Sequence, residues 1–112
     1  MVVLKKTLIE KLRRQRNEKK SLFDLDIVAR ITNKAIDYCF YLICFSDDKE
    51  NDVIAYLYGE KSGVTFITLN ELKRCKVDDK LFELDEDFKE IKFDDFLKQR
   101  KYEDMQKFVD SL

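Results

Sequence analysis

The chain has no histidine and no proline, and only two of its 112 residues are glycine. Without histidine, neither the usual zinc sites nor catalysis that relies on an imidazole can be built. A phosphate-binding loop or a dinucleotide fingerprint needs several glycines within a few residues, so both are excluded as well. These absences favour a protein that is not an enzyme and that uses no cofactor and no metal.

Long apolar stretches are also missing. The longest apolar run is far below the ~18 residues of a membrane-spanning helix, and charges within the first twelve residues argue against a signal peptide. An odd number of cysteines, three, favours reduced thiols in the cytoplasm. Cys39 and Cys44 are five residues apart, a spacing that points them to different sides of a strand or a helix. We therefore expect buried thiols that act as small hydrophobic side chains.

The chain is rich in apolar and charged residues, and its charges balance. Apolar residues make up 45% and charged residues 40%, yet the net charge is only -1. Intrinsic disorder requires low hydrophobicity together with high net charge, so this composition predicts a folded chain. The length suits one domain over residues 1–112.

The first third of the chain predicts a helix followed by an ambiguous segment. The four-residue spacing of Leu4, Leu8 and Leu12 indicates an amphipathic helix over residues 1–20, whose basic second half continues into solvent. In residues 21–31 the apolar side chains alternate as in a strand, but they also recur every four residues as in a helix. The alternation slightly favours a strand.

The middle of the chain predicts antiparallel strands. Residues 36–45 are apolar and aromatic on both faces, which is typical of a central strand covered on two sides. Residues 53–58 and 64–67 form a predicted hairpin, and Gly59 and Gly63 bracket its connection. We expect these glycines to serve a tight turn that needs a residue tolerating positive φ.

The last third predicts a short helix at residues 69–75, one or two edge strands in the acidic stretch 77–93, and a helix at 94–112. The apolar face of that helix contains Leu97, Met105, Phe108 (or Val109) and Leu112. The predicted fold is therefore α+β: an antiparallel β-meander of about four strands in residues 21–93, flanked by an N-terminal basic helix and a C-terminal amphipathic helix. We expect both helices to pack on the sheet as one unit.

Two groups of side chains could bind a protein partner. Tyr and Phe are enriched at protein interfaces, and spaced carboxylates can imitate phosphates. The candidate residues are Tyr38 and Phe40 on one strand face, Tyr56 and Tyr58 on another, and Asp85, Glu86 and Asp87 in the acidic stretch.

The basic N-terminal helix is a candidate nucleic-acid interface. Residues 1–34 carry ten cations and four anions, whereas the remainder carries twelve cations and nineteen anions. Five cations fall on an arc of roughly 100° of the helix and could follow a phosphate backbone: Lys5, Lys6, Arg13, Arg16 and Lys20. The alternative is that they pair with the acidic remainder of the same fold or of a second copy.

A metal-dependent nuclease is a further alternative. Asp52, Glu71 and Lys73 follow the order of the catalytic hairpin of PD-(D/E)xK nucleases, in which two carboxylates hold a divalent metal. However, Glu71 stands three residues after Thr68, the spacing of a helix capping box, and this explains its presence better. We do not treat the pattern as membership of that family.

Together these patterns predict a small, non-enzymatic, cytoplasmic domain that binds a protein partner, as small regulators or inhibitors carried by phages and mobile elements do. Nucleic-acid binding is the first alternative. The two opposed charge zones also suit a homodimer, and no contact with a membrane is expected.

Overall fold

The computed structural model describes residues 5–33, 38–59, 62–74, 76–77, 80–81 and 83–112. The helices are α1 (Lys6–Asn17), the short 3-10 helix η1 (Leu22–Asp24), α2 (Leu69–Arg74) and α3 (Phe93–Asp110). The strands are β1 (Asp26–Ile27), β2 (Ala29–Asn33), β3 (Tyr38–Phe45), β4 (Asp52–Tyr58), β5 (Gly63–Thr68), β6 (Lys76–Val77), β7 (Lys80–Leu81), β8 (Glu83–Leu84) and β9 (Ile91–Lys92).

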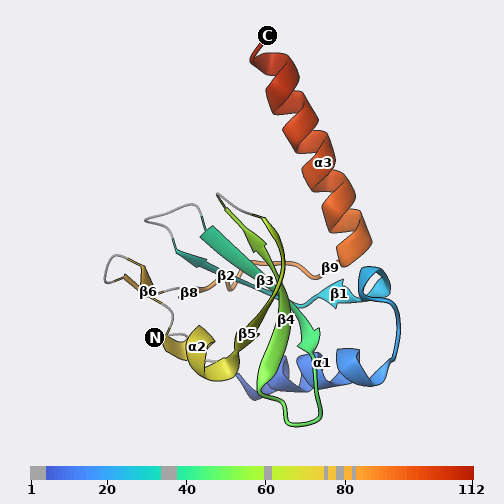
Figure 1. Cartoon of the computed structure of the whole chain (residues 1–112), viewed down its shortest axis with the longest axis vertical. Helices are drawn as coiled ribbons and strands as arrows, with labels where there is room; N and C mark the ends of the chain where they lie inside the picture. The colour runs from blue at the N-terminus through green and yellow to red at the C-terminus, as the bar shows by residue number, and fades with distance from the viewer. Residues whose placement is uncertain (1–4, 34–37, 60–61, 75, 78–79, 82) are drawn as a thin grey trace.

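Five strands form an antiparallel sheet in the order β5-β4-β3-β2-β8. Strands β2 to β5 follow one another as a meander, and β8 pairs with β2, where Ile31 faces Leu84. Two short ribbons, β1–β9 and β6–β7, lie outside this sheet (Figure 1). The predicted α+β meander with a helix before it and a helix after it is confirmed, with one strand more than expected.

The middle strand β3 separates two hydrophobic cores. Leu42 and Phe45 enter the first core, which α1 covers with Leu12. Tyr41 enters the second core on the opposite face, where Phe93 at the start of α3 is also buried. The prediction of a central strand covered on both faces is confirmed for Tyr38–Phe45.

A β-bulge in β3 changes the face that one cysteine occupies. The pairing with β4 shifts by one residue between Leu42 and Cys44, which leaves Ile43 as the extra residue. Cys44 is therefore buried in the second core, against which Cys39 also packs. The prediction that these two thiols point to different sides is wrong, because the bulge shifts the alternation. Burial raises the pKa of the Cys44 thiol.

The β4–β5 hairpin forms where it was predicted, but its glycines have a different role. Neither Gly59 nor Gly63 has a positive φ, so the expected left-handed turn conformation is wrong. A Cβ atom at Gly59 would lie 2.6 Å from the ring of Tyr38, whereas nothing lies within 4 Å of one at Gly63. Gly59 is therefore needed for the close approach of an aromatic ring.

In the ambiguous segment 21–31 the strand that the alternation slightly favoured forms only from Asp26 onward, because η1 comes first and leads into β1 and β2. The expected solvated extension of the basic helix is only partly correct. Helix α1 ends at Asn17, and Gln15 in its last turn is buried. The Gln15 Nε2 group donates to the backbone oxygens of Asp26 at 2.5 Å and Ile43 at 3.4 Å, which ties this part of α1 to β1 and β3.

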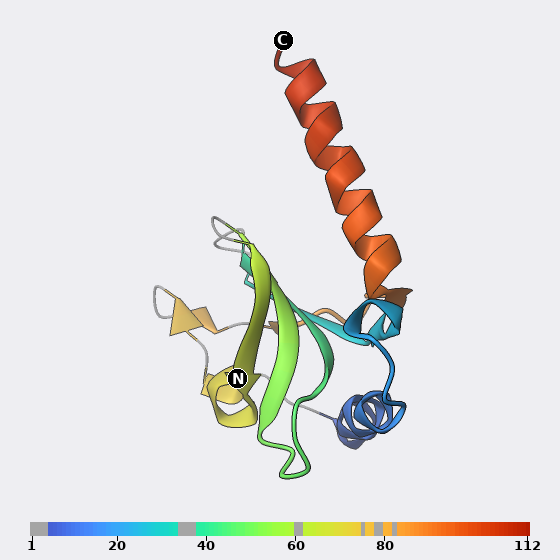
Figure 2. The same ribbon diagram turned by 45° about the vertical axis from the view of Figure 1, so that its right-hand side comes forward.

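Helix α3 starts and ends close to its predicted bounds, but it leaves the body of the protein (Figures 1 and 2). Only Phe93 and Phe96 are buried, and residues 101–112 are all exposed. The molecule measures 48 × 36 × 23 Å, and α3 runs roughly along the longest dimension. The expectation that the apolar face of this helix packs on the sheet is wrong.

Candidate functional site

The first two turns of α3 anchor it to the sheet. The Phe96 ring centre lies 4.5 Å from that of Tyr41 on β3 and 5.7 Å from that of Tyr56 on β4. One turn later, the guanidinium carbon of Arg100 lies 4.0 Å from the ring centre of Tyr58. The Arg100 Nη2 group also donates to the Tyr41 hydroxyl over 2.7 Å. These contacts set the direction in which α3 leaves the sheet.

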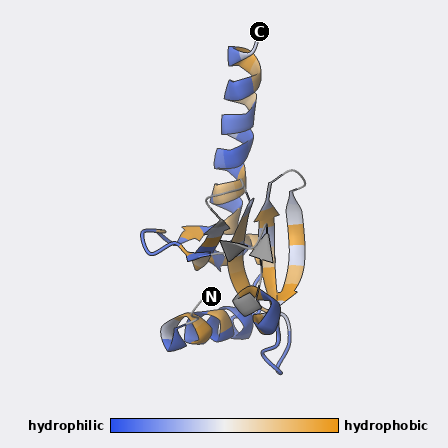
Figure 3. Cartoon of the chain, turned by 90° about the vertical axis from the view of Figure 1, so that its left-hand side faces the viewer, coloured by the Kyte–Doolittle hydropathy of each residue, from blue (hydrophilic) through white to orange (hydrophobic). Residues whose placement is uncertain are grey.

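Beyond Arg100, α3 carries large apolar side chains that are mainly in solvent. Five of them, each between 57% and 91% exposed, form what we call the outer stripe: Tyr102, Met105, Phe108, Val109 and Leu112. At about 100° per residue, this stripe is centred roughly 150° around the helix from Phe93, Phe96 and Arg100. The contacts of Phe93, Phe96 and Arg100 with the sheet therefore leave these five side chains uncovered. Figure 3 shows apolar and polar residues alternating along this helix.

A groove of about 670 Å³ lies between α3 and the face of β4. Tyr56 contributes from the sheet, and the remaining lining residues are Leu97, Arg100, Lys101, Asp104, Met105, Phe108 and Val109 on α3. We call this the α3 groove. Its surface is mostly apolar, with charged groups at a few positions, which is the usual composition of a binding site.

The apolar surface continues from the groove onto the edge strand β5. Val64 and Phe66 pair with Tyr56 and Ile54, so these four side chains share the face that bears the groove. Phe66 is 64% exposed. In the described part of the chain, β5 pairs with β4 alone. No charged residue or proline protects this edge, although natural sheets usually protect theirs.

The aromatic residues predicted to bind a partner are divided between the two faces of the sheet. Tyr56 and Tyr58 lie on the groove face, where Tyr56 lines the groove and Tyr58 holds Arg100. Tyr38 and Phe40 pack against the first core on the other face. The structure therefore brings together only half of the predicted aromatic set.

The predicted acidic residues lie in one loop and contact cations of the same chain. Asp85 forms an ion pair with Arg30, and its Oδ1 atom accepts a hydrogen bond from the backbone N–H of Asp87 at 3.0 Å. Glu86 pairs with Lys5 at 3.5 Å. Asp87 itself is exposed. None of these three residues lines the α3 groove.

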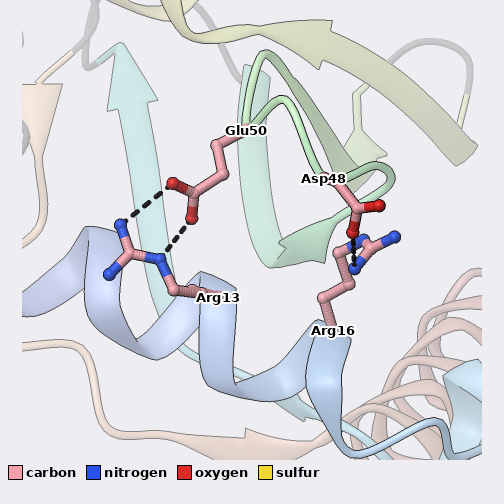
Figure 4. Close-up of polar contacts among 4 residues, drawn as sticks. All are labelled: Arg13, Arg16, Asp48 and Glu50. Carbon is pink, nitrogen blue, oxygen red and sulfur yellow. Dashed lines mark hydrogen bonds and ion pairs between the residues drawn. The ribbon is translucent and has the colours of Figure 1, made fainter.

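The basic residues of α1 also find partners within the chain. The Arg13 guanidinium binds Glu50 through two hydrogen bonds of 2.5 and 2.9 Å, and Arg16 pairs with Asp48 at 2.6 Å (Figure 4). Both carboxylates belong to the β3–β4 turn, and the hydrogen bond from Arg13 lowers the pKa of Glu50.

The two remaining candidate cations differ from each other. Lys20 pairs with Glu18 at 3.3 Å, whereas Lys6 is exposed and enters no ion pair within the described residues. Four of the five predicted nucleic-acid contacts are thus engaged with carboxylates of the same chain. This arrangement matches the alternative in which the basic helix pairs with the acidic part of its own fold.

The residues of the nuclease alternative occupy a strand start and a helix start. Asp52 begins β4, opposite Thr68 at the end of β5. Glu71 is in the first turn of α2, and its backbone N–H donates to Thr68 Oγ1 at 3.0 Å, which confirms the helix cap. The side chain of Lys73 lies outside the part of the chain that can be described. Within that part, no three cysteine or acidic side chains gather as a set of metal ligands.

Sequence reasoning missed Arg100 and Phe66, which complete the apolar surface and its anchor. A helical wheel drawn for residues 93–112 would have shown one apolar arc of roughly 240°, and a helix that packs on the sheet with one side of so wide an arc exposes the other side. The exposure of Phe66 depends on β5 being an edge strand, which no local pattern reveals.

Comparisons with protein-family models, with curated proteins and with solved structures found no match. No helix in the described residues combines the length and the apolar character needed to cross a membrane.

Proposed function

We propose that this protein is a non-enzymatic binding domain that contacts a protein partner through the α3 groove and the outer stripe. The observation that carries the proposal is the exposure of five large apolar side chains within eleven consecutive residues. Continuous apolar patches of this size are typical of interaction surfaces. Tyr, Phe and Met, which contribute three of the five, are enriched in interfaces.

The stability of the outer helix supports the same conclusion. Residues 101–110 have no buried side chain, so this part of α3 gains little from tertiary packing, which supplies most of the stability of helices in proteins. Burial of the outer stripe by a partner would stabilise these turns. Binding of a partner would therefore remove the unfavourable exposure of the outer stripe to solvent.

The groove also provides the means for selectivity. Lys101 and Asp104 are placed among apolar side chains, where a partner with matched charges is favoured and one with like charges is rejected. The contacts of Arg100 with Tyr58 and Tyr41 fix the groove wall before binding. Such preorganisation reduces the entropy that association costs.

The proposal is tested by affinity capture from a nuclease-treated lysate of the source organism. Phe108→Glu places a carboxylate in the groove, and Gln106→Glu adds the same group to the polar side of the same helix. We expect wild type and Gln106→Glu to capture the same protein, and Phe108→Glu to capture at least about tenfold less of it. Equal capture by all three, with unchanged circular dichroism, would contradict a role for the groove.

The nucleic-acid alternative has less support, because four of its five cations already pair with carboxylates of the chain. Titration with duplex and single-stranded DNA at low and moderate salt separates the two functions. Tight binding at low salt that weakens steeply as salt rises would favour nucleic acid.

A further inference from the structure

We propose that the partner of the α3 groove is a second copy of this chain, and that the two α3 helices pair antiparallel. The inference rests on the protein-binding function proposed above, whose partner it names. A single copy carries both an unfilled groove and an unpaired apolar helix. In a dimer with a two-fold axis, the helix of each copy fills the groove of the other, because the same surface patch is used on both subunits.

The spacing of four groove residues defines the pairing. Leu97, Lys101, Asp104 and Phe108 are separated by four, three and four residues, which is the spacing of the contact positions in a pair of packed helices. When Lys101 of one copy faces Asp104 of the second copy, Leu97 must face Phe108 of the second copy. Each of these contacts then occurs twice, once in each direction.

The charges at the centre of this seam are available for that contact. Lys101 and Asp104 form no ion pair within the described residues, although they are only three positions apart on the helix. Other charges of α3 do pair locally, namely Lys98 with Asp94 at 3.1 Å and Arg100 with Glu103 at 3.4 Å. The two unpaired charges that line the groove are of opposite sign, so the surface is complementary to itself.

The charge along the whole helix favours the same direction. Residues 93–101 carry three cations and two anions, whereas residues 102–110 carry one cation and three anions. Antiparallel pairing places the positive half of each helix beside the negative half of the other. A parallel pair would align like charges instead.

The apolar surface beside this seam approaches the size of a standard interface. A covered Phe side chain buries about 150–250 Å², and because Phe66 and Phe108 are about two thirds exposed, these two alone add roughly 200–330 Å² per copy. Met105, Leu112 and Val64 beside them bring the surface toward the roughly 800 Å² that each partner contributes to a standard interface. Antiparallel pairing also brings the C-terminal end of each α3 helix near the N-terminal end of the other α3, where Tyr56 and Val64 lie.

Two single charge reversals test the pairing by sedimentation velocity. We expect the wild type to dimerise, and Lys101→Glu or Asp104→Lys to weaken dimerisation at least about tenfold, because like charges then face each other twice. Mixing the two variants restores every pair to opposite sign, so an equimolar mixture should dimerise within about threefold of wild type. Lys107→Glu, on the polar side of α3, is the matched control and should dimerise as wild type does.

The outcomes separate this inference from the function on which it rests. A wild type that stays monomeric up to about 1 mM overturns the second copy as partner, while groove-dependent capture of another protein would still uphold the binding function. A wild type that dimerises, combined with a mixture of variants that does not, overturns the pairing of Lys101 with Asp104. Loss of dimerisation in Lys107→Glu to the same extent would also overturn it.

Discussion

The guanidinium of Arg100 stacks on the ring of Tyr58, with 4.0 Å between its central carbon and the ring centre. Because Tyr58 ends β4 and Arg100 is in the second turn of α3, this contact joins the sheet to the helix at the point where the helix departs. The same guanidinium donates to the Tyr41 hydroxyl. Arg100 thus holds α3 at an angle that keeps the groove open.

Replacing Arg100 is expected to loosen the helix from the sheet. Arg100→Ala removes a cation–π contact and a hydrogen bond, and we expect a loss of about 1–2 kcal/mol in the free energy of unfolding. Urea denaturation monitored by circular dichroism measures this change in the free energy of unfolding. Lys98→Ala, at an exposed position of the same helix, should change stability by less than about 0.5 kcal/mol. Equal losses in the two variants would show that Arg100 is not an anchor.

The two hairpin glycines should respond in opposite ways to the same substitution. Gly59→Ala places a Cβ atom against the Tyr38 ring and should destabilise the protein by about 1–3 kcal/mol. Gly63→Ala meets no atom and should be neutral or stabilise by up to about 1 kcal/mol. The midpoint temperatures of thermal unfolding compare the stabilities of the two variants with that of the wild type. If Tyr38→Ala in the Gly59→Ala background does not reduce the loss, the steric explanation is incorrect.

Gln15 is the buried polar residue of α1, and its amide supports two backbone oxygens. Gln15→Ala leaves those oxygens without that donor and should cost about 1–3 kcal/mol. Gln15→Glu should be at least as destabilising at neutral pH, because a carboxylate cannot donate to a carbonyl oxygen. Gln106→Ala, exposed on α3, is the control for chemical denaturation. A Gln15→Ala variant as stable as this control would refute the structural role of the amide.

The Arg13–Glu50 pair predicts a pH-dependent contribution to stability. The hydrogen bond from Arg13 lowers the pKa of Glu50 in the folded protein. The pair therefore stabilises the fold above the unfolded-state pKa of Glu50, and this contribution is lost as the pH falls through the lower folded-state pKa. Glu50→Gln should destabilise the protein at pH 7, and the difference from wild type should disappear in acid. Denaturant titrations of the wild type and Glu50→Gln across that range measure the difference, and a difference that stays constant down to acid pH would contradict the role of the pair.

The local patterns predicted most of the elements because the information lies within a few residues. The cap of α2 is one example, since the Thr68 side chain and the Glu71 backbone are three positions apart. The β4–β5 hairpin and the two-faced character of β3 follow from alternation and turn residues in the same way. Tyr56 and Tyr58 were also recognised as candidate contact residues.

The remaining features depend on contacts between distant segments. The bulge at Ile43 follows from how β3 and β4 pair, and it moves Cys44 to a face that alternation did not predict. The need for glycine at position 59 arises from Tyr38, twenty-one residues earlier. Periodicity shows that α3 has an apolar face. It cannot show that Phe96 packs the helix against the sheet while Met105 remains exposed to solvent.

Hydrogen exchange of the α3 amides at residues 102–110, followed from dilute to concentrated protein, tests the role of this helix most directly. A helical segment with no packing partner exchanges quickly, whereas a paired one is protected. We predict protection of these amides that rises with concentration in parallel with the dimer fraction, and that Phe108→Glu abolishes it. Fast exchange at every concentration, or full protection at concentrations where the chain sediments as a monomer, would contradict a contact surface on α3.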